Sequence, residues 1–145
     1  MIKNSDLPKF PYHRDPVESK SVRETEAKCD CCGKAPGIMY DGVIYSVEDP
    51  ENICPWCIAD GSASEKYDGS FFDAYFVDDD FNNIEVAPDY YPKVFCQTIG
   101  FSTYNPIGWW VHCDQPAEFV TREEPYDMIF ECKVCGKRHT IEDLD

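Results

Sequence analysis

The sequence predicts an α+β fold built as one small domain. Two observations support this class. The predicted helices and strands are short and do not alternate regularly, which is typical of α+β proteins. The chain has 145 residues, of which 14% are aromatic, and this is about the size of one domain with a moderate hydrophobic core. We therefore expect residues 1–145 to form a single domain.

The N-terminal part of the chain predicts an arm followed by a hairpin. Residues 5–20 predict an extended arm, because their prolines restrict the backbone and oppose helix formation. Residues 38–45, "IMYDGVIY", predict a β-hairpin. Apolar residues lead into and out of Asp41-Gly42, a pair that suits a two-residue type I′ turn.

The remaining elements are also expected to be short. Residues 55–67 predict a helix that is interrupted at Gly61. The segment 71–81, "FFDAYFVDDDF", is typical of a strand or of irregular chain. Residues 88–110 are rich in Tyr, Pro, Gly and Trp and predict packed loops with short elements. Residues 127–143, "DMIFECKVCGKRHTIED", predict two strands around a turn.

The charge of the chain limits its partners. It carries 28 acidic and 13 basic residues, a formal net charge of −15. This excess argues against nucleic acid, because binding a phosphate backbone requires Lys and Arg that displace counterions. It argues equally against an anionic membrane surface. A basic protein would fit better, because opposite fields accelerate encounter.

The N-terminal stretch "MIKNSDLPKFPYHRDP" lacks the apolar core of a secretory signal. No run of the sequence approaches the roughly 18 apolar residues of a membrane-spanning helix. We therefore expect a cytoplasmic protein. In that reducing compartment its nine cysteines point to metal rather than to disulfides.

Two C-x-x-C pairs predict a zinc ribbon around residues 29–57. Cys29 and Cys32 fit a zinc knuckle, a tight turn whose two-residue spacer places both thiolates on one tetrahedral face. The glycine that follows them permits the left-handed backbone of such a turn. The predicted hairpin would then return the chain, so that Cys54 and Cys57 complete a four-cysteine site.

The pair Cys54-Pro55-Trp56-Cys57 also allows a second interpretation, as the redox pair of a thiol oxidoreductase. That chemistry needs a C-x-x-C that opens a helix in a βαβ unit, and no such unit precedes this pair. A second pair already lies at zinc-ligand spacing. The structural zinc site is therefore the favoured interpretation.

A second zinc knuckle is predicted around residues 113–139. Residues 132–137, "CKVCGK", repeat the C-x-x-C-G-K pattern of residues 29–34. Cys132 and Cys135 would supply two ligands, and Cys113 is the best candidate for the third, because thiolates commonly bind zinc together. The sequence leaves the fourth ligand open among three candidates: His112, Cys96 and His139.

The chain resembles the CbrC family of bacterial proteins over most of its length. The segment "ICPWCIADGSASEKYDGSF" at 53–71 is the most distinctive part of this resemblance. Further similar segments are "LPKFPYHRDP" at 7–16, "CDCCG" at 29–33, "IMYDGVIYS" at 38–46, "TIGFSTYNPIGWWVHC" at 98–113 and "IFECKVCGK" at 129–137. The resemblance implies a role in tolerance of, or immunity to, bacterial toxins, without a known reaction.

We therefore expect a non-enzymatic zinc protein that binds a toxin. Because many antibacterial toxins are basic nucleases, we expect the toxin to be of this type. The acidic and aromatic segment 71–81 is the expected recognition surface, and its candidate contact residues are Asp78, Asp79, Asp80 and Phe81. Two alternatives remain. One is an enzyme, either a thiol oxidoreductase that uses Cys54 and Cys57 or a zinc hydrolase with an open coordination position. The other is a zinc-stabilised adaptor between proteins.

Overall fold

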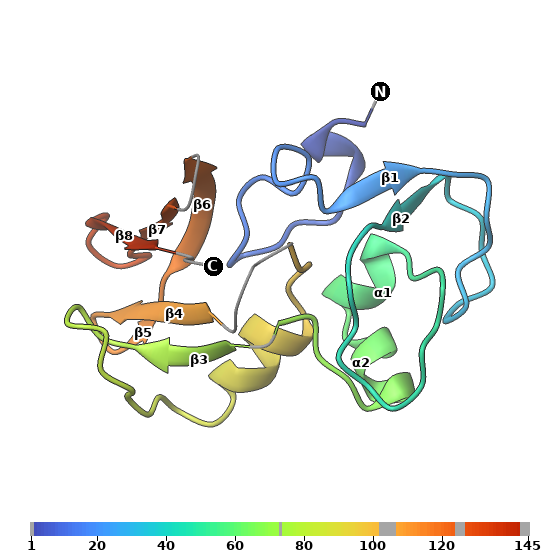
Figure 1. Cartoon of the computed structure of the whole chain (residues 1–145). Coiled ribbons are helices and arrows are strands. Elements are labelled where there is room, and N and C mark those ends of the chain that lie inside the picture. Colours follow the sequence, from blue (N-terminus) through green and yellow to red (C-terminus); the bar gives the residue numbers. More distant parts are fainter. Residues whose placement is uncertain (1, 73, 102–106, 124–126, 143–145) are drawn as a thin grey trace.

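A computed structural model describes residues 2–72, 74–101, 107–123 and 127–142. Parts of the predicted segments 71–81 and 88–110, namely residues 73 and 102–106, lie outside these ranges. The fold is α+β, as the sequence predicts. Its described part contains small sheets and short helices (Figure 1). None of the described helices is long and apolar enough to cross a membrane.

The N-terminal half contains a two-stranded sheet and two helices. Strands β1 (Val22–Glu24) and β2 (Ile38–Tyr40) pair antiparallel. Helices α1 (Pro55–Ala59) and α2 (Ser62–Tyr67) follow, and in Figure 1 α1 lies next to β2 while α2 lies next to α1. The helix predicted over 55–67 is thus confirmed together with its interruption at Gly61, which has a φ of 84°.

The hairpin predicted over residues 38–45 is wrong. A type I′ turn needs a positive φ at both central residues, and neither Asp41 nor Gly42 has one. Strand β2 pairs instead with β1. The N–H of Tyr45 donates to the carbonyl of Ser70 at 2.8 Å, so the chain beyond β2 contacts the segment after α2 and does not fold back on β2.

The described residues of the C-terminal half form two three-stranded sheets. The first has the order β3-β4-β5 and consists of β3 (Ala74–Val77), β4 (Ile107–His112) and β5 (Gln115–Pro116), with β3 parallel to β4. The short helix η2 (Pro92–Cys96) lies between β3 and β4 in the chain. Of the two alternatives left open for residues 71–81, strand or irregular chain, the structure has a strand, β3. The short element expected within 88–110 is confirmed as η2.

The second sheet is an antiparallel meander with the order β6-β7-β8. Its strands are β6 (Glu118–Glu123), β7 (Asp127–Glu131) and β8 (Arg138–Glu142). Strands β7 and β8 flank the "CKVCGK" turn, as the sequence predicts.

Aromatic side chains join these elements into one core. Trp109 of β4 is fully buried. Its ring lies 5.0 Å from that of Phe72, 6.2 Å from that of Phe95 in η2 and 5.1 Å from that of Phe130 in β7. Edge-on aromatic pairs at these distances are favourable beyond their buried area. Trp109 therefore ties both C-terminal sheets to η2.

The predicted N-terminal arm packs against this core. The extended conformation expected over residues 5–20 is wrong, because the arm includes the short 3-10 helix η1 (Asn4–Asp6) and then a series of turns. His13 is buried, its ring lies 5.1 Å from that of Phe119, and it forms an isolated bridge with the same residue of β6. The arm is thus an integral part of the fold.

Candidate metal centres

The four cysteines of the predicted ribbon lie together. The sulfur atoms of Cys29, Cys32, Cys54 and Cys57 are all within 4.8 Å of one another, and we call them the first cluster. The Sγ atoms of Cys29 and Cys57 are 3.9 Å apart, and those of Cys54 and Cys57 are 3.5 Å apart. Four thiolates at the zinc–sulfur distance would form a tetrahedron with edges of about 3.8 Å. The donor set therefore fits a zinc ion.

The two halves of the first cluster are held together by Asp30, which lies inside the knuckle. Its Oδ2 accepts hydrogen bonds from the N–H groups of Glu51 at 2.9 Å and Asn52 at 3.1 Å. Its own N–H donates to the carbonyl of Asn52 at 2.7 Å. This clasp returns the chain to the knuckle just before Cys54. The sequence predicts that a hairpin over residues 38–45 brings Cys54 and Cys57 back to Cys29 and Cys32; these hydrogen bonds do so instead.

The second cluster consists of His112, Cys113, Cys132 and Cys135, whose ligand atoms also lie within 4.8 Å of one another. Nδ1 of His112 is 3.3 Å from Sγ of Cys113 and 3.4 Å from Sγ of Cys135. A tetrahedral zinc ion would separate a nitrogen and a sulfur ligand by about 3.6 Å. This set also fits zinc.

Of the candidates for the fourth ligand, the structure places only His112 in this cluster. Cys96 lies at the end of η2 and His139 in β8, and neither belongs to the group. The turn between β4 and β5 allows His112 and Cys113, which are neighbours in the chain, to face the same site. Cys113 and Asp114 both have a positive φ, of 55° and 62°, as in a type I′ turn. This sharp reversal lets adjacent side chains face one site.

The repeated C-x-x-C-G-K motif forms the same turn in both clusters. The N–H of the first cysteine donates to the carbonyl of the lysine at 2.8 Å, in Cys29 to Lys34 and again in Cys132 to Lys137. The N–H of the glycine donates back to the carbonyl of that cysteine, at 2.8 Å for Gly33 and 3.0 Å for Gly136. These contacts make each motif a closed knuckle.

The fold lowers the pKa of the first cysteine in each knuckle. Burial raises the pKa of Cys132, but N–H groups of the knuckle and the side chain of His112 outweigh it and lower that pKa to about 6. At Cys29 burial is likewise outweighed by backbone hydrogen bonds, and the pKa is lowered. Burial and the neighbouring thiols raise the pKa of Cys54 and that of Cys113 to about 11. Each knuckle thus favours the thiolate form of its first cysteine, whereas a cation would be needed to ionise Cys54 and Cys113 near neutral pH.

The two clusters differ in their exposure. In the first, Cys29, Cys54 and Cys57 are buried and only Cys32 is exposed. In the second, Cys132 is buried, whereas Cys113 and Cys135 are exposed. The second cluster is therefore more accessible to solvent.

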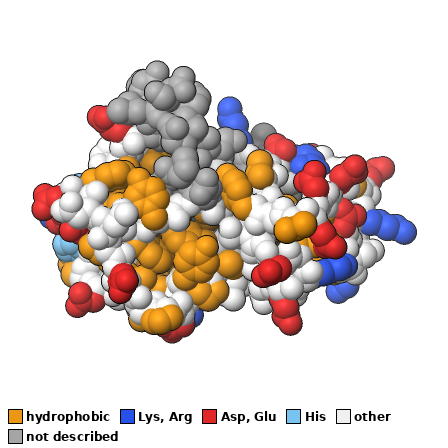
Figure 2. All heavy atoms as spheres, turned by 60° about the horizontal axis from the view of Figure 1, so that its bottom comes forward, with side chains coloured by type: hydrophobic (Ala, Val, Ile, Leu, Met, Phe, Trp, Pro, Cys, Tyr) orange, Lys and Arg blue, Asp and Glu red, His pale blue; other side chains and the backbone are white. Residues whose placement is uncertain are grey.

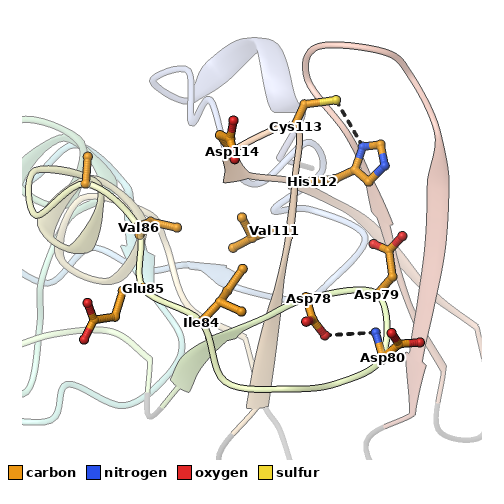
Figure 3. Close-up of a pocket in the computed structure, with 11 residues that line it drawn as sticks. Asp78, Asp79, Asp80, Ile84, Glu85, Val86, Val111, His112, Cys113 and Asp114 are labelled. Atoms are coloured by element: carbon orange, nitrogen blue, oxygen red, sulfur yellow. Dashed lines mark hydrogen bonds between the residues drawn. The ribbon is translucent and has the colours of Figure 1, made fainter.

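An open, acidic cleft of about 480 Å³ adjoins the second cluster. Figure 3 shows His112 and Cys113 on one side of it and the turn with Asp78 and Asp80 on the other. Glu85 and Asp114 add further carboxylates to its lining.

The predicted contact residues at this cleft have different environments. Oδ1 of Asp78 accepts hydrogen bonds from the N–H groups of Asp80 at 3.0 Å and Asn82 at 2.9 Å, so Asp78 shapes its own turn. Asp79 accepts a hydrogen bond from Trp110, and this bond lowers the pKa of its carboxyl group. Asp80 and Phe81 are exposed. The sequence did not indicate this division of roles.

The comparisons with known proteins agree on one family. The model described as "Uncharacterised protein family (UPF0167)" matches residues 7–127. This range includes the first cluster, His112 and Cys113, and it ends before Cys132. No solved structure shows a significant match.

Curated relatives include a UPF0167 protein of Pseudomonas aeruginosa, 40% identical over 118 residues, which are 80% of this chain and 64% of that protein. UPF0167 proteins of Mycobacterium bovis and Mycobacterium tuberculosis are 39% identical over 115 residues, 79% of this chain and 59% of theirs. The chain thus spans less than two thirds of the length of these relatives. On the match to the family model and on these identities, the chain belongs to the UPF0167 family.

Proposed function

We propose that this chain is a protein with two structural zinc sites whose acidic surface binds a basic protein partner. The observation that carries the metal part is that each cluster gathers four soft donors at spacings that fit a tetrahedral ion. Such sites contribute on the order of 10–16 kcal/mol of apparent binding free energy in zinc-finger peptides. That contribution would stabilise a fold made of short elements.

The proposed role of zinc is structural in the first cluster. Four cysteine ligands leave no position for a reacting water. The enzymatic alternatives, a thiol oxidoreductase using Cys54 and Cys57 or a zinc hydrolase, remain predictions from the sequence.

The proposed contact surface is the aromatic and acidic turn after β3. The side chain of Phe81 is 49% exposed, and its ring meets that of Tyr75, 36% exposed, edge-on at 6.1 Å. In Figure 2 apolar side chains gather on one face of the molecule, with acidic side chains around them. Exposed aromatic residues beside charged ones are typical anchors of protein interfaces. The net charge of −15 favours a basic partner.

We further propose that the partner is a toxin and that binding confers tolerance, as in the CbrC family that the sequence resembles. The test is survival of bacteria that express the chain when they are challenged with basic, nuclease-type colicins, followed by binding kinetics with the purified nuclease domain. Protection together with direct binding supports the proposal. Absence of both protection and binding, even at low salt, contradicts it.

The contact surface itself is tested with matched variants of the chain. Asp80→Asn should slow association and flatten its dependence on salt, because long-range attraction sets the association rate. Glu65→Gln on α2 removes the same charge from a different element (Figure 1) and is the control. Phe81→Ala should accelerate dissociation, roughly tenfold for an anchor residue. Equal effects of the Asp80 and Glu65 variants, with no effect at Phe81, would place the contact elsewhere.

A further inference from the structure

The turn formed by residues 78–82 is fastened to the second cluster through Asp79. Oδ1 of Asp79 accepts a hydrogen bond from Nε1 of Trp110 at 2.7 Å. Its Oδ2 lies 3.5 Å from Nζ of Lys137. Both partners are neighbours of cluster residues, since Trp110 precedes His112 by two positions on β4 and Lys137 closes the knuckle of Cys132. A single carboxylate thus joins the turn to both segments of the cluster.

Trp110 is itself held by histidine rings. The imidazole of His112 stacks on its indole with centroids 4.9 Å apart and planes 30° apart. The imidazole of His139 in β8 stacks on it as well, at 5.0 Å and 25°. Trp110 is fully buried. The orientation of the His112 ring, which a bound metal would fix, therefore bears directly on the indole that holds Asp79.

The shape of the turn and its attachment have separate origins. Hydrogen bonds to Asp78 determine the shape, because its side chain accepts from Asp80 and Asn82 and its carbonyl accepts from the N–H of Phe81 at 3.1 Å. Phe81 has a φ of 64°, a conformation that is costly for an aromatic residue. The contacts of Asp79 then attach this strained turn to the cluster. Loss of these contacts would leave the turn closed but without its link to the second cluster.

We propose that metal bound at the second cluster holds the 78–82 turn in position through Trp110 and Asp79, so that metal occupancy controls the partner surface. This inference rests on the proposed function, because it requires zinc at that cluster. Coupling between two sites is reciprocal. If zinc raises the affinity for a partner that binds the positioned turn, that partner must raise the zinc affinity of the second cluster by the same factor.

Hydrogen exchange of the 78–82 amides, measured on the whole chain with zinc as the only added ligand, tests this proposal. Native mass spectrometry identifies the species with two zinc ions, and stepwise chelation together with Cys135→Ser gives the species that lacks the second. We expect the rate of hydrogen exchange in residues 78–82 to rise roughly fivefold or more when the second zinc leaves. Fivefold is the lower end of typical coupling factors between two sites. Unchanged exchange in that segment would overturn the proposal.

A matched pair of variants keeps the test decisive if both zinc ions leave together or if Cys135→Ser does not fold. Asp79→Ala removes the contacts with Trp110 and Lys137. Asp80→Ala removes a neighbouring carboxylate that does not make these contacts. We expect Asp79→Ala to weaken zinc at the second cluster roughly fivefold and Asp80→Ala to leave it unchanged. Equal zinc affinities in the two variants would refute the coupling. Because no partner protein is used, failure of this test is distinct from failure of toxin binding.

Discussion

Replacing the knuckle glycines with alanine should weaken each metal site by a similar amount. Gly33 has a φ of 77° and Gly136 a φ of 79°, in the left-handed region that glycine adopts without steric cost. A Cβ atom added at either position would meet no heavy atom within 4 Å. The cost of Gly33→Ala and of Gly136→Ala is therefore conformational, without a contribution from clashes.

The size of this cost follows from the backbone. The left-handed conformation costs an L-residue roughly 1–2 kcal/mol. Alanine also lowers the entropy of the unfolded chain, which offsets part of that cost. We expect a net loss of about 1 kcal/mol, roughly a fivefold weaker zinc complex. Asparagine tolerates this region better, so Gly33→Asn and Gly136→Asn should recover part of the loss.

Competition with a chelator of known zinc affinity measures these changes, and native mass spectrometry shows how many ions each variant retains. Gly33→Ala should weaken the first site alone and Gly136→Ala the second alone. The reasoning is refuted if either alanine variant binds zinc as tightly as the natural chain. It is also refuted if asparagine proves worse than alanine at both positions.

Two further predictions concern His13 and Gly108. Burial lowers the pKa of His13 to about 4, so its ring should stay neutral down to pH 5. Because the carbonyl of Ile99 accepts a hydrogen bond from Nδ1 at 2.8 Å, the proton of the neutral ring should reside on Nδ1. Nitrogen NMR shifts report both the pKa and the tautomer. A titration midpoint near pH 6.5 would contradict the lowered pKa, and a proton on Nε2 would contradict the tautomer. A Cβ at Gly108 would lie 2.7 Å from the ring of Phe81, so Gly108→Ala should displace that ring; ring resonances of Phe81 that match those of the natural chain would contradict this.

The linkage of His13 to stability has a definite sign. Its pKa in the fold lies below the ordinary value of 6.5, so the unfolded chain binds the proton more readily. The contribution of the neutral ring is complete above about pH 6.5 and is lost as the pH falls toward 4. Cysteine-bound zinc is also released by acid, so the NMR titration is preferable to acid unfolding as a measurement.

The cysteine spacing predicted both clusters better than it predicted the path of the chain between their members. The two C-x-x-C-G-K motifs form equal knuckles because their turn is local and needs only the glycine. The return of Cys54 to the knuckle depends on Asp30 and Asn52. Such a contact between distant segments leaves no periodic pattern in the sequence, and the Asp41-Gly42 pair, a strong turn signal, suggested the wrong hairpin.

The role of the β4–β5 turn was equally hidden. A positive φ at Cys113 and Asp114 was not expected, because turn signals are read from Gly and Asn pairs. Without this turn the sequence could not select His112 over Cys96 and His139 as the fourth ligand. The sequence held a weak signal for the link to the 78–82 turn, because Trp110 and His112 are two residues apart, and such residues share a face when they lie on a strand. The position of Asp79 opposite them depends on the parallel pairing of β3 with β4, which the sequence does not encode locally.

The central claim is that the two clusters are separate structural zinc sites, and native mass spectrometry of the chain purified without chelator tests it most directly. Cys32→Ser and Cys135→Ser form a matched pair, because each replaces an exposed cysteine of one cluster. The account predicts two zinc ions in the natural chain and the loss of one in each variant. A natural chain without zinc, or one with Cys54 and Cys57 joined in a disulfide, would contradict the account and favour redox chemistry.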